Sequence, residues 1–574
     1  MARACGSYPQ CRRFKSVLRY FIKVVTKYYY FVTAFFIDEY IEDTYNKETV
    51  SKGGDKVKAD IVVKVIDPSN HKETKLYLKE GENLLEAMRA FGLPVLAECG
   101  ARGRCGKCLI RVVEGRLDIT VQDKKILSRL LLSQGYRLAC MAYPNQDCTV
   151  ILAAAMETNY HVIAETLSQA DESSIKIGND SKASYGIAID IGTTTLAFAL
   201  VDLAKGNILK KHTATNPQRI YAADVVSRIK ASNEGKLELF MKLTGKELLH
   251  GISILVKKEQ ITLSHIQKII ISANTTMIHI FMGYPCEGLA TYPFNPHREG
   301  FIKTSTDEVF NISESIPIII LPAISAFVGG DISAGLLACG FDRRKKPALL
   351  IDLGTNGEIA LGNKEKILVT STSAGPAFEG GNISCGVGSI PGAICHVNIK
   401  EGKLSYETIE GALPVGLCGT GVIELTSQLL KEGIIDKTGL LIDRYFDTGY
   451  PIESIKFLQE DIRQLQLAKG AIAAGVEILI KKYGISYEEL DRVYIAGGFG
   501  YHLDVKKAID IGLLPNSLID KTEAVGNTAL SGAILSLIDF QAEKRLNYII
   551  SIAKEINLSN ENEFNDLFIQ HISF

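Results

Sequence analysis

Three cysteines stand close together in one glycine-rich stretch, and a fourth follows at a distance. Cys99, Cys105 and Cys108 lie in the run C-G-A-R-G-R-C-G-K-C, with C-x5-C-x2-C spacing, and Cys140 follows in R-L-A-C. A 2Fe-2S cluster needs four ligands, and ferredoxins take three of their cysteines from one loop. Glycines in such a loop let backbone N–H groups turn toward the cluster without a Cβ clash. The spacing therefore predicts a 2Fe-2S cluster held by these four cysteines.

Two other kinds of site also use four cysteines. Disulfides need an oxidising compartment, and the sequence carries no convincing secretory signal. Zinc sites usually take their cysteines as two close pairs, not as a trio and a single residue. The cluster is therefore the favoured interpretation. The remaining cysteines, including Cys385, Cys395 and Cys418, lack metal-ligand spacing and are expected to be small buried hydrophobic side chains.

A second kind of chemistry is indicated by a short pattern that occurs twice. Residues 185–195 read Y-G-I-A-I-D-I-G-T-T-T, and residues 349–358 read L-L-I-D-L-G-T-N-G-E. Each is an apolar strand that runs into Asp-x-Gly-Thr, a tight hairpin whose N–H groups and hydroxyls can bind phosphate. The Asp at each strand end can hold Mg2+, which prefers one or two carboxylates with waters and phosphates. Two such hairpins facing each other are expected to clamp ATP.

The nucleotide site is expected to draw on further strand and helix ends. Residues 493–500, V-Y-I-A-G-G-F-G, are another apolar strand that runs into a glycine pair, against which a nucleoside can lie. We assign catalytic roles to Asp190, Asp352 and Glu358, with Glu358 positioning the attacking water. The residues expected to bind the cofactor are Gly192, Thr193, Thr194, Thr195, Asn274, Asp331, Gly354, Thr355, Asn356, Gly497 and Gly498.

Several polar residues near these motifs also have purely structural interpretations. Asn216 and Asp224 can cap helices. His279 lies inside an apolar run and is expected to be a satisfied core histidine. Residues 461–480 have helical apolar spacing, with Gly470 expected at a close packing contact.

Length and composition limit the remaining possibilities. A chain of 574 residues exceeds one ordinary core and is expected to form several domains. Its hydrophobic content of 46% and charged content of 22% are those of a globular protein. The net charge of −1 argues against nucleic acid as an obligatory partner.

The chain divides into six segments by composition and periodicity. Residues 58–153 are predicted to be a β-grasp ferredoxin-type domain, with strands at 59–66, 75–78 and 109–113 and a helix at 83–91. Residues 154–184 are rich in turn formers and predict a linker. The remaining segments are a basic and aromatic extension (1–57), the two halves of an ATPase domain (185–345 and 346–540) and a helical tail (541–574).

Residues 1–57 are the least typical part of the sequence. Seven basic residues precede the first acidic one, and the apolar run at 28–37 is too short to span a bilayer. Contact with a membrane surface and a transit peptide are alternatives. We favour a dispensable extension, and expect no membrane span and a cytoplasmic protein.

Taken together, the motifs resemble the acetate and sugar kinase, heat-shock chaperone and actin (ASKHA) superfamily. Within it, the sequence resembles the ASKHA-type reductive activators of corrinoid-dependent enzymes, from about residue 58 to residue 535. The resemblance implies an α+β ferredoxin domain followed by an α/β, duplicated actin-like (ribonuclease-H-like) domain. It rests also on the runs at 216–229 (N-P-Q-R-I-Y-A-A-D-V-V-S-R-I), 273–279 (A-N-T-T-M-I-H), 327–332 (F-V-G-G-D-I), 373–381 (S-A-G-P-A-F-E-G-G) and 416–421 (G-L-C-G-T-G).

The resemblance implies that the protein uses ATP to return an inactive Co(II) corrinoid to Co(I), with one electron from the 2Fe-2S cluster. It implies a corrinoid protein of a methyltransferase system as partner, an upstream electron donor, and a homodimer. Plant-type 2Fe-2S centres lie near about −400 mV, and the family's target couple lies lower. An uphill one-electron step costs about 2.3 kcal/mol per 100 mV, which ATP can supply.

Three other functions are compatible with parts of the pattern. A small-molecule kinase of the same superfamily gives no reason for a fused ferredoxin. An activator of a radical dehydratase needs a 4Fe-4S cluster in the ATPase domain itself. A non-catalytic redox docking module does not turn over nucleotide.

Overall fold

The computed structural model describes most of the chain after residue 60. The described residues are 61–67, 72–91, 93, 95, 101, 103, 108–127, 129–152, 184–453, 455–497 and 503–574. The predicted extension (1–57) and all but Ser184 of the predicted linker therefore lie outside them. Within these ranges, every helix is too short or too polar to cross a membrane.

The ferredoxin-type domain is built on one mixed sheet. Its strands are β1 (Ile61–Asp67), β2 (Lys72–Leu78), β3 (Leu109–Glu114), β4 (Tyr136–Leu138) and β5 (Cys148–Leu152), in the order β2-β1-β5-β3-β4. Only β1 and β5 run parallel. The helical segments are α2 (Leu84–Ala90), α3 (Val121–Ile126), α4 (Arg129–Ser133) and η1 (Ala139–Met141). The predicted strands and helix are confirmed in β1, β2, β3 and α2, with small shifts at their ends.

Helix α2 shows why this domain folds as the sequence predicts. Asn83 caps the helix, because its side chain accepts hydrogen bonds from the N–H groups of Leu85 and Glu86. Leu84, Leu85 and Met88, which follow helical spacing, are buried in the domain core.

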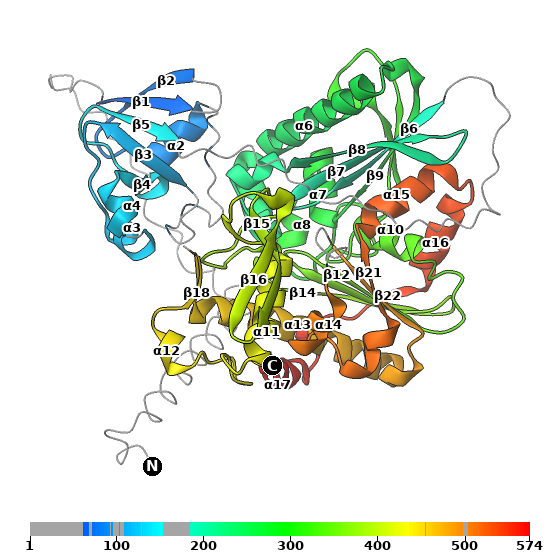
Figure 1. Ribbon diagram of the computed structural model, residues 1–574. Helices are drawn as coiled ribbons and strands as arrows, with labels where there is room; N and C mark the ends of the chain where they lie inside the picture. The colour runs from blue at the N-terminus through cyan, green and yellow to red at the C-terminus, as the bar shows by residue number, and fades with distance from the viewer. Residues whose placement is uncertain are drawn as a thin grey trace. The chain divides into compact units, whose positions relative to one another are not determined.

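The first half of the predicted ATPase domain is a six-stranded sheet with helices (Figure 1). Its strands are β6 (Tyr185–Ile191), β7 (Thr195–Asp202), β8 (Asn207–Thr215), β9 (Ile266–Ala273), β10 (Ile302–Ser305) and β11 (Pro317–Ile320), in the order β10-β11-β9-β6-β7-β8. Its helical segments are η3 (Pro217–Ile220), α5 (Val225–Ala231), η4 (Ser232–Lys236), α6 (Leu237–Lys258), η5 (Leu263–His265), α7 (Thr275–Met282), α8 (Glu287–Ala290), α9 (Thr306–Phe310) and α10 (Gly330–Ala338).

The second half repeats this plan. Its main strands are β12 (Ala348–Leu353), β13 (Gly357–Gly362), β14 (Ile367–Thr372), β20 (Arg492–Ala496), β21 (Thr522–Gly526) and β22 (Ala553–Glu555), in the order β21-β20-β12-β13-β14-β22. Smaller sheets contain β15 (Ala393–Lys400), β16 (Lys403–Thr408), β17 (Gly416–Leu417), β18 (Tyr450–Ile452) and β19 (Ile455–Phe457). The helical segments are η6 (Pro376–Glu379), η7 (Ile409–Gly411), α11 (Gly419–Lys431), α12 (Asp443–Phe446), α13 (Gln459–Tyr483), η8 (Tyr487–Glu489), α14 (Val505–Asp510), η10 (Asn516–Lys521), α15 (Thr528–Ile538), α16 (Ala542–Ile552), η11 (Leu558–Asn560) and α17 (Phe564–Ile572).

The duplication seen in the sequence is also present in the topology. In each half, an antiparallel meander (β6-β7-β8 or β12-β13-β14) is extended by a parallel strand, β9 or β20, and then by another, β11 or β21. The two Asp-x-Gly-Thr segments therefore occupy equivalent hairpins, β6-β7 and β12-β13. The segment after residue 540 is not only helical, because β22 pairs in parallel with β14.

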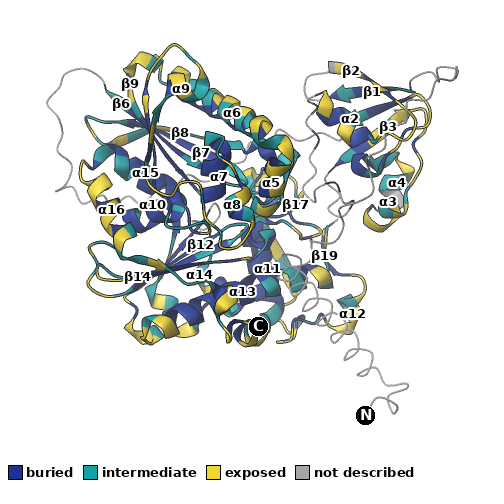
Figure 2. Cartoon of the chain, turned by 180° about the vertical axis from the view of Figure 1, so that it is seen from behind, coloured by how far each residue is buried: buried dark blue, intermediate teal, exposed yellow. Residues whose placement is uncertain are grey.

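Two helices lie in the core that both sheets share. Helices α10 and α15 contribute buried residues to the same cluster as β6, β7, β12 and β13 (Figure 2). A Cβ on Gly532 of α15 would lie 2.1 Å from the carbonyl oxygen of Ala334 in α10, so a side chain there would force the helices apart. This close crossing joins the two halves of the domain, since α10 belongs to the first half and α15 to the second.

Candidate functional site

The first hairpin places a row of small polar residues at the end of β6. Residues 192–194 form its tip, and β7 begins at Thr195. The N–H of Gly192 donates to the carbonyl of Thr195 at 2.9 Å and closes the turn. Asn274 caps α7 with its Oδ1, while its Nδ2 donates to Thr193 Oγ1 at 3.1 Å. The structure thus brings Asn274 to the first hairpin.

The second hairpin has an equivalent tip but a different partner. The N–H of Gly354 donates to the carbonyl of Asn356 at 3.0 Å. The hydroxyl of Thr355 donates to Glu379 Oε2 at 2.6 Å. In this structure, the Thr355 proton is therefore directed to Glu379, and Thr355 can offer a phosphate only its backbone N–H. Glu379 lies in the S-A-G-P-A-F-E-G-G run and is not among the predicted site residues.

Four carboxyl groups from both halves form an acidic cluster between the hairpins. Asp190 lies next to the last residue of β6, Asp352 and Glu358 face each other across β12 and β13, and Asp331 lies in the first turn of α10. Each is neither fully buried nor fully exposed. The predicted acidic residues therefore come together although they are far apart in the sequence.

The pKa of each of these four groups is raised. Loss of water contact is the largest cause throughout, and it raises the pKa of Asp190 to about 7 and that of Asp331 to about 6. Burial, followed by the charges of Asp331 and Asp190, raises the pKa of Asp352 to about 8. Burial and the same kind of repulsion raise the pKa of Glu358 well above its usual value. A positive ion in this cluster would relieve the repulsion.

The chemistry of the acidic cluster fits magnesium bound together with a nucleotide. Among the described residues, no three acidic, histidine or cysteine side chains converge closely enough to hold a metal ion by themselves. Mg2+ is bound in nucleotide sites through one or two carboxylates, with waters and phosphates completing its coordination. The cluster can supply those one or two carboxylates.

Sequence reasoning missed a residue that contacts Asp190 from the other half of the domain. Asn527 follows β21 and caps α15 with its Oδ1, which fixes its Nδ2 toward Asp190 Oδ2 at 2.8 Å. Asn274 stands in the same local context, since A-N-T at 273–275 and G-N-T at 526–528 both join a strand to a helix. That similarity is the signal that could have found Asn527.

The proposed nucleoside glycines lie at the end of β20. Gly497 has φ of 120°, a conformation that L side chains rarely adopt, and a Cβ there would lie 2.3 Å from the carbonyl oxygen of Leu353. Its N–H donates to the carbonyl of Gly526 at 3.1 Å. Glycine is thus required for close approach of β20 to β12. Gly498 lies outside the described residues.

Two of the four predicted cluster ligands can be placed. Cys108 precedes β3, and Cys140 lies in η1; their sulfurs are 3.2 Å apart and both side chains are buried. Cys99 and Cys105 lie outside the described residues. Two buried sulfurs side by side at the start of β3 are a donor set that suits a 2Fe-2S cluster.

The structural alternatives also have clear outcomes. Asn216 and Asp224 do cap η3 and α5. His279 is fully buried, its Nδ1 lies 2.8 Å from the carbonyl of Thr275, and its Nε2 accepts from the N–H of His297. The interpretation of His279 as a satisfied core histidine is confirmed. Gly470 packs closely, because a Cβ there would lie 3.3 Å from the carbonyl oxygen of His571.

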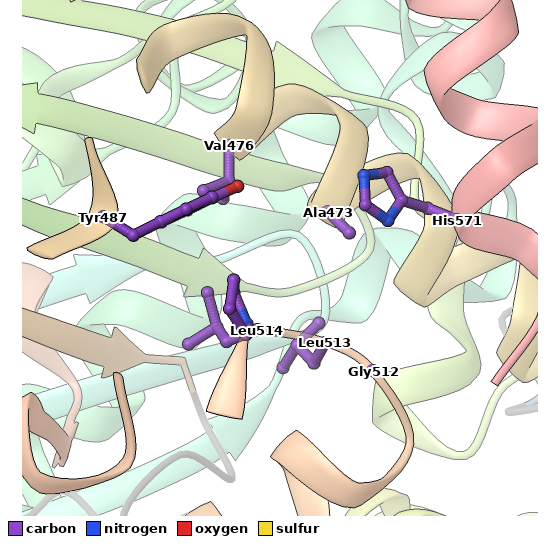
Figure 3. Close-up of a pocket in the computed structure, with 8 residues that line it drawn as sticks. Ala473, Val476, Tyr487, Gly512, Leu513, Leu514 and His571 are labelled. Atoms are coloured by element: carbon purple, nitrogen blue, oxygen red, sulfur yellow. The ribbon is translucent and has the colours of Figure 1, made fainter. Parts of the chain in front are cut away.

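A cavity of about 200 Å³ lies away from these residues, between α13 and the segment 512–515 (Figure 3). Its walls are mainly apolar, from Ala473, Val476, Leu513 and Leu514, with Tyr487 and His571 at its edge. It contains none of the predicted site residues. The acidic cluster, where both hairpins meet, is the better candidate for catalysis.

Comparisons with known proteins agree with this architecture. Residues 68–145 match the 2Fe-2S iron-sulfur cluster binding domain, residues 185–344 the RACo middle region, and residues 346–574 the C-terminal ASKHA domain of RACo. Over 585 residues the chain is 30% identical to the corrinoid activation enzyme RamQ of Eubacterium limosum, covering 88% of this chain and 98% of RamQ. This chain belongs to the RACo family of reductive activators.

Other RACo relatives cover most of the same length. The Co(II) methylated amine-specific corrinoid protein reductase of Methanosarcina barkeri is 28% identical over 432 residues, covering 68% of this chain and 77% of that protein. The solved structure of a reductive activator for corrinoid, iron-sulfur protein is 29% identical, with a TM-score of 0.66, and covers 89% of this chain and 98% of its own. RACo membership confirms the predicted fold class.

The raised carboxyl pKa values predict how stability depends on pH without magnesium. A carboxyl whose pKa is raised by folding contributes stability that is complete below its unfolded pKa of about 4 and is lost as pH rises through the folded pKa. For Asp331, Asp190 and Asp352 this loss begins near pH 4 and is complete only once the pH has passed the folded pKa of about 6, 7 and 8, respectively. At each pH, the Tm with excess Mg2+ is compared with the Tm in EDTA. We expect this difference to be a few degrees larger at pH 9 than at pH 5.5.

The control for this measurement is Asp352→Asn, which removes one titrating group from the cluster. Its magnesium-dependent rise in Tm should vary less with pH than that of the wild type. An equal response to Mg2+ at both pH values in the wild type would contradict the prediction.

Proposed function

We propose that this protein is an ATP-dependent reductive activator of a corrinoid protein. One observation carries the proposal: a single chain joins a ferredoxin-type domain to a duplicated ATPase domain with an acidic cluster between its two hairpins. A small-molecule kinase of the same superfamily has no use for the first domain, and a simple electron carrier has no use for the second. Membership of the RACo family supports the same conclusion.

In this proposal, the two hairpins hold the phosphates of ATP from opposite sides. Asp190 and Asp352 supply carboxylates for Mg2+, and Asn527 holds Asp190 in place across the interface between the halves. Glu358 pairs with Asp352 across β12 and β13, and Ser371 Oγ of β14 donates to its carboxylate at 3.2 Å; we assign to Glu358 the positioning of the attacking water. The nucleoside lies against the backbone at Gly497.

The cysteines of the first domain, Cys99, Cys105, Cys108 and Cys140, would hold a 2Fe-2S cluster. Such a cluster supplies single electrons, at a potential of about −400 mV in plant-type ferredoxins. The substrate is a corrinoid protein of a methyltransferase system in its inactive Co(II) form, and the product is Co(I). Because raising one electron by 100 mV costs about 2.3 kcal/mol, ATP binding or hydrolysis provides the driving force by favouring a complex in which cobalt is easier to reduce.

The remaining parts of the proposal concern partners and place. An upstream electron donor must reduce the cysteine-held centre between turnovers. We place the protein in the cytoplasm, where thiols stay reduced, and propose that it works as a homodimer. Neither nucleic acid nor a membrane span has a role.

Full reactivation is expected to need both domains in one chain. With a Co(II) corrinoid protein, a weak reductant and Mg-ATP under anaerobic conditions, the Co(II) absorbance should disappear. Omitting ATP should stop the reaction. Cleavage of the chain within residues 173–184 should slow it greatly but spare ATP hydrolysis and iron content, because a tether holds two modules at high effective concentration. Reduction at full rate without ATP, or by the severed halves, would exclude this mechanism.

A further inference from the structure

Helix α5 carries a fully buried arginine behind the tip of the first hairpin. Arg228 has 0% of its surface exposed. Its guanidinium donates to the carbonyl of Thr193 at 2.6 Å, to the carbonyl of Ala222 at 3.1 Å and to Met277 Sδ at 3.1 Å. Among the described residues, no carboxylate lies within the 4.0 Å that defines an ion pair with it. The structure thus buries a positive charge that has carbonyl partners but no counter-charge in contact.

Asn216 binds the same hairpin from the same run of sequence. Its Nδ2 donates to the carbonyl of Gly192 at 2.8 Å, and its backbone N–H donates to the carbonyl of Thr194 at 2.9 Å. Together with the bond from Arg228 to Thr193, this engages three consecutive carbonyls of the tip. The run at 216–229, in which Asn216 and Asp224 had been expected only to cap helices, is therefore a clamp on the backbone of residues 192–194.

Because the carbonyls of the tip are bound by Asn216 and Arg228, the peptide planes are fixed and the N–H groups of Thr193 and Thr194 remain available to a ligand. Within the described part of the chain, the N–H groups of Thr193 and Thr194 have no hydrogen-bond acceptor, whereas their carbonyls all do. Successive unpaired backbone N–H groups form a concave site for an anion. The two N–H donors are preorganised by the fixed carbonyls, so binding of a phosphate costs little conformational entropy.

The positive charge of Arg228 also favours binding of an anion at the tip. A buried guanidinium is costly unless a negative group compensates it, and burial lowers the pKa of Arg228 to about 9. The acids that stabilise its charge from a distance are Asp224 of its own helix cap and Glu379 of the second half. An anion seated on the N–H groups of the adjacent tip would supply the counter-charge that is not in contact.

We propose that Arg228 is a positioning residue of the phosphate site: it fixes the Thr193 peptide so that the tip N–H groups are presented to a nucleotide phosphate, and its buried charge favours that anion. Arg228 does not itself touch the ligand, because it is sealed behind the hairpin. This inference rests on the proposed ATPase function. Arg228 should affect the affinity for the phosphates but not for the nucleoside, because the proposed nucleoside site is at Gly497.

The test compares binding of ATP and of adenosine by isothermal titration calorimetry on the full chain. Arg228→Lys keeps the charge but replaces the planar fork of donors with one ammonium group, and Arg228→Met removes both. Lys230→Met is the matched control, because it removes the same charge from the same helix at a side chain that is 73% exposed. We expect Arg228→Lys to weaken ATP binding about tenfold and Arg228→Met about a hundredfold, with adenosine affinity unchanged.

Two outcomes would overturn the proposed role of Arg228. One is an Arg228→Lys protein that binds ATP as tightly as the wild type. The other is an equal loss of ATP and adenosine affinity, which would indicate general damage to the fold. If Arg228→Met does not fold, the Arg228→Lys result alone is decisive. Wild-type protein that binds no ATP would overturn the proposed function as well, whereas wild-type binding with an unaffected Arg228→Lys variant overturns only the role of Arg228.

Discussion

Replacing Asp352 with alanine is expected to lower the rate of Mg-ATP hydrolysis at least about a hundredfold, the loss typical of removing a group that stabilises charge at the reacting centre. Asp352 lies at the end of β12 in the acidic cluster, where burial and neighbouring carboxylates raise its pKa to about 8. A bound cation would relieve the repulsion between these carboxylates. Removing the Asp352 carboxylate should therefore also weaken the site's affinity for Mg2+. Asp190→Ala is expected to have the same effect from the first hairpin.

The visible spectrum of the iron-sulfur centre serves as a control for damage outside the ATP site. Both alanine variants should keep it unchanged, because the cluster cysteines belong to another domain of the chain. Asp520→Ala, at an exposed position of η10, is the matched control and should hydrolyse ATP at the wild-type rate. Wild-type hydrolysis by Asp352→Ala in the presence of the corrinoid partner would exclude the second hairpin from the site.

The duplicated hairpins could be predicted from sequence because each is a local feature. An apolar strand, an Asp and a Gly-Thr turn lie within about ten consecutive residues, and the same short pattern occurs twice. Strand pairing then follows, since β6 with β7 and β12 with β13 are joined by tight turns. The prediction that the two acidic strand ends meet needed only the assumption that both halves have one topology.

The residues that were missed act over long distances in the sequence. Asn527 lies 337 residues from its partner Asp190, and Glu379 reaches the Thr355 hydroxyl from a separate turn. Arg228 was missed for another reason: an arginine in an amphipathic helix is ordinarily exposed, and nothing in its spacing indicates that it turns inward to backbone carbonyls. Such contacts depend on tertiary packing, which one sequence does not display.

The tail after residue 540 illustrates the same limit in the fold. A helical tail was expected there, but the three residues of β22 carry no strand pattern of their own. They form a strand because β14 presents an unpaired edge to them. Short edge strands of this kind are set by the neighbouring sheet rather than by local preference.

The other large effect concerns the iron-sulfur centre and its fourth ligand. Cys140→Ser is expected to lose most of the iron, which should be about two atoms per chain in the wild type. Cys140 lies in η1 with its sulfur 3.2 Å from that of Cys108, whose own position at the end of the glycine-rich loop marks it as a ligand. A hydroxyl is a poor replacement, because iron in these clusters is bound by thiolates.

Cys148 provides the matched control, since it is the next cysteine in the sequence and is equally buried. It lies in β5, where burial and the charge of Asp147 raise the pKa of its thiol to about 11. A thiol held in its protonated form is a poor metal ligand, so Cys148→Ser should keep its iron and its colour. Iron content and the visible absorption of anaerobically purified protein measure both variants. Equal loss of iron from the two would mean that Cys140 is not the specific fourth ligand, and iron loss from Cys148→Ser alone would transfer that role to β5.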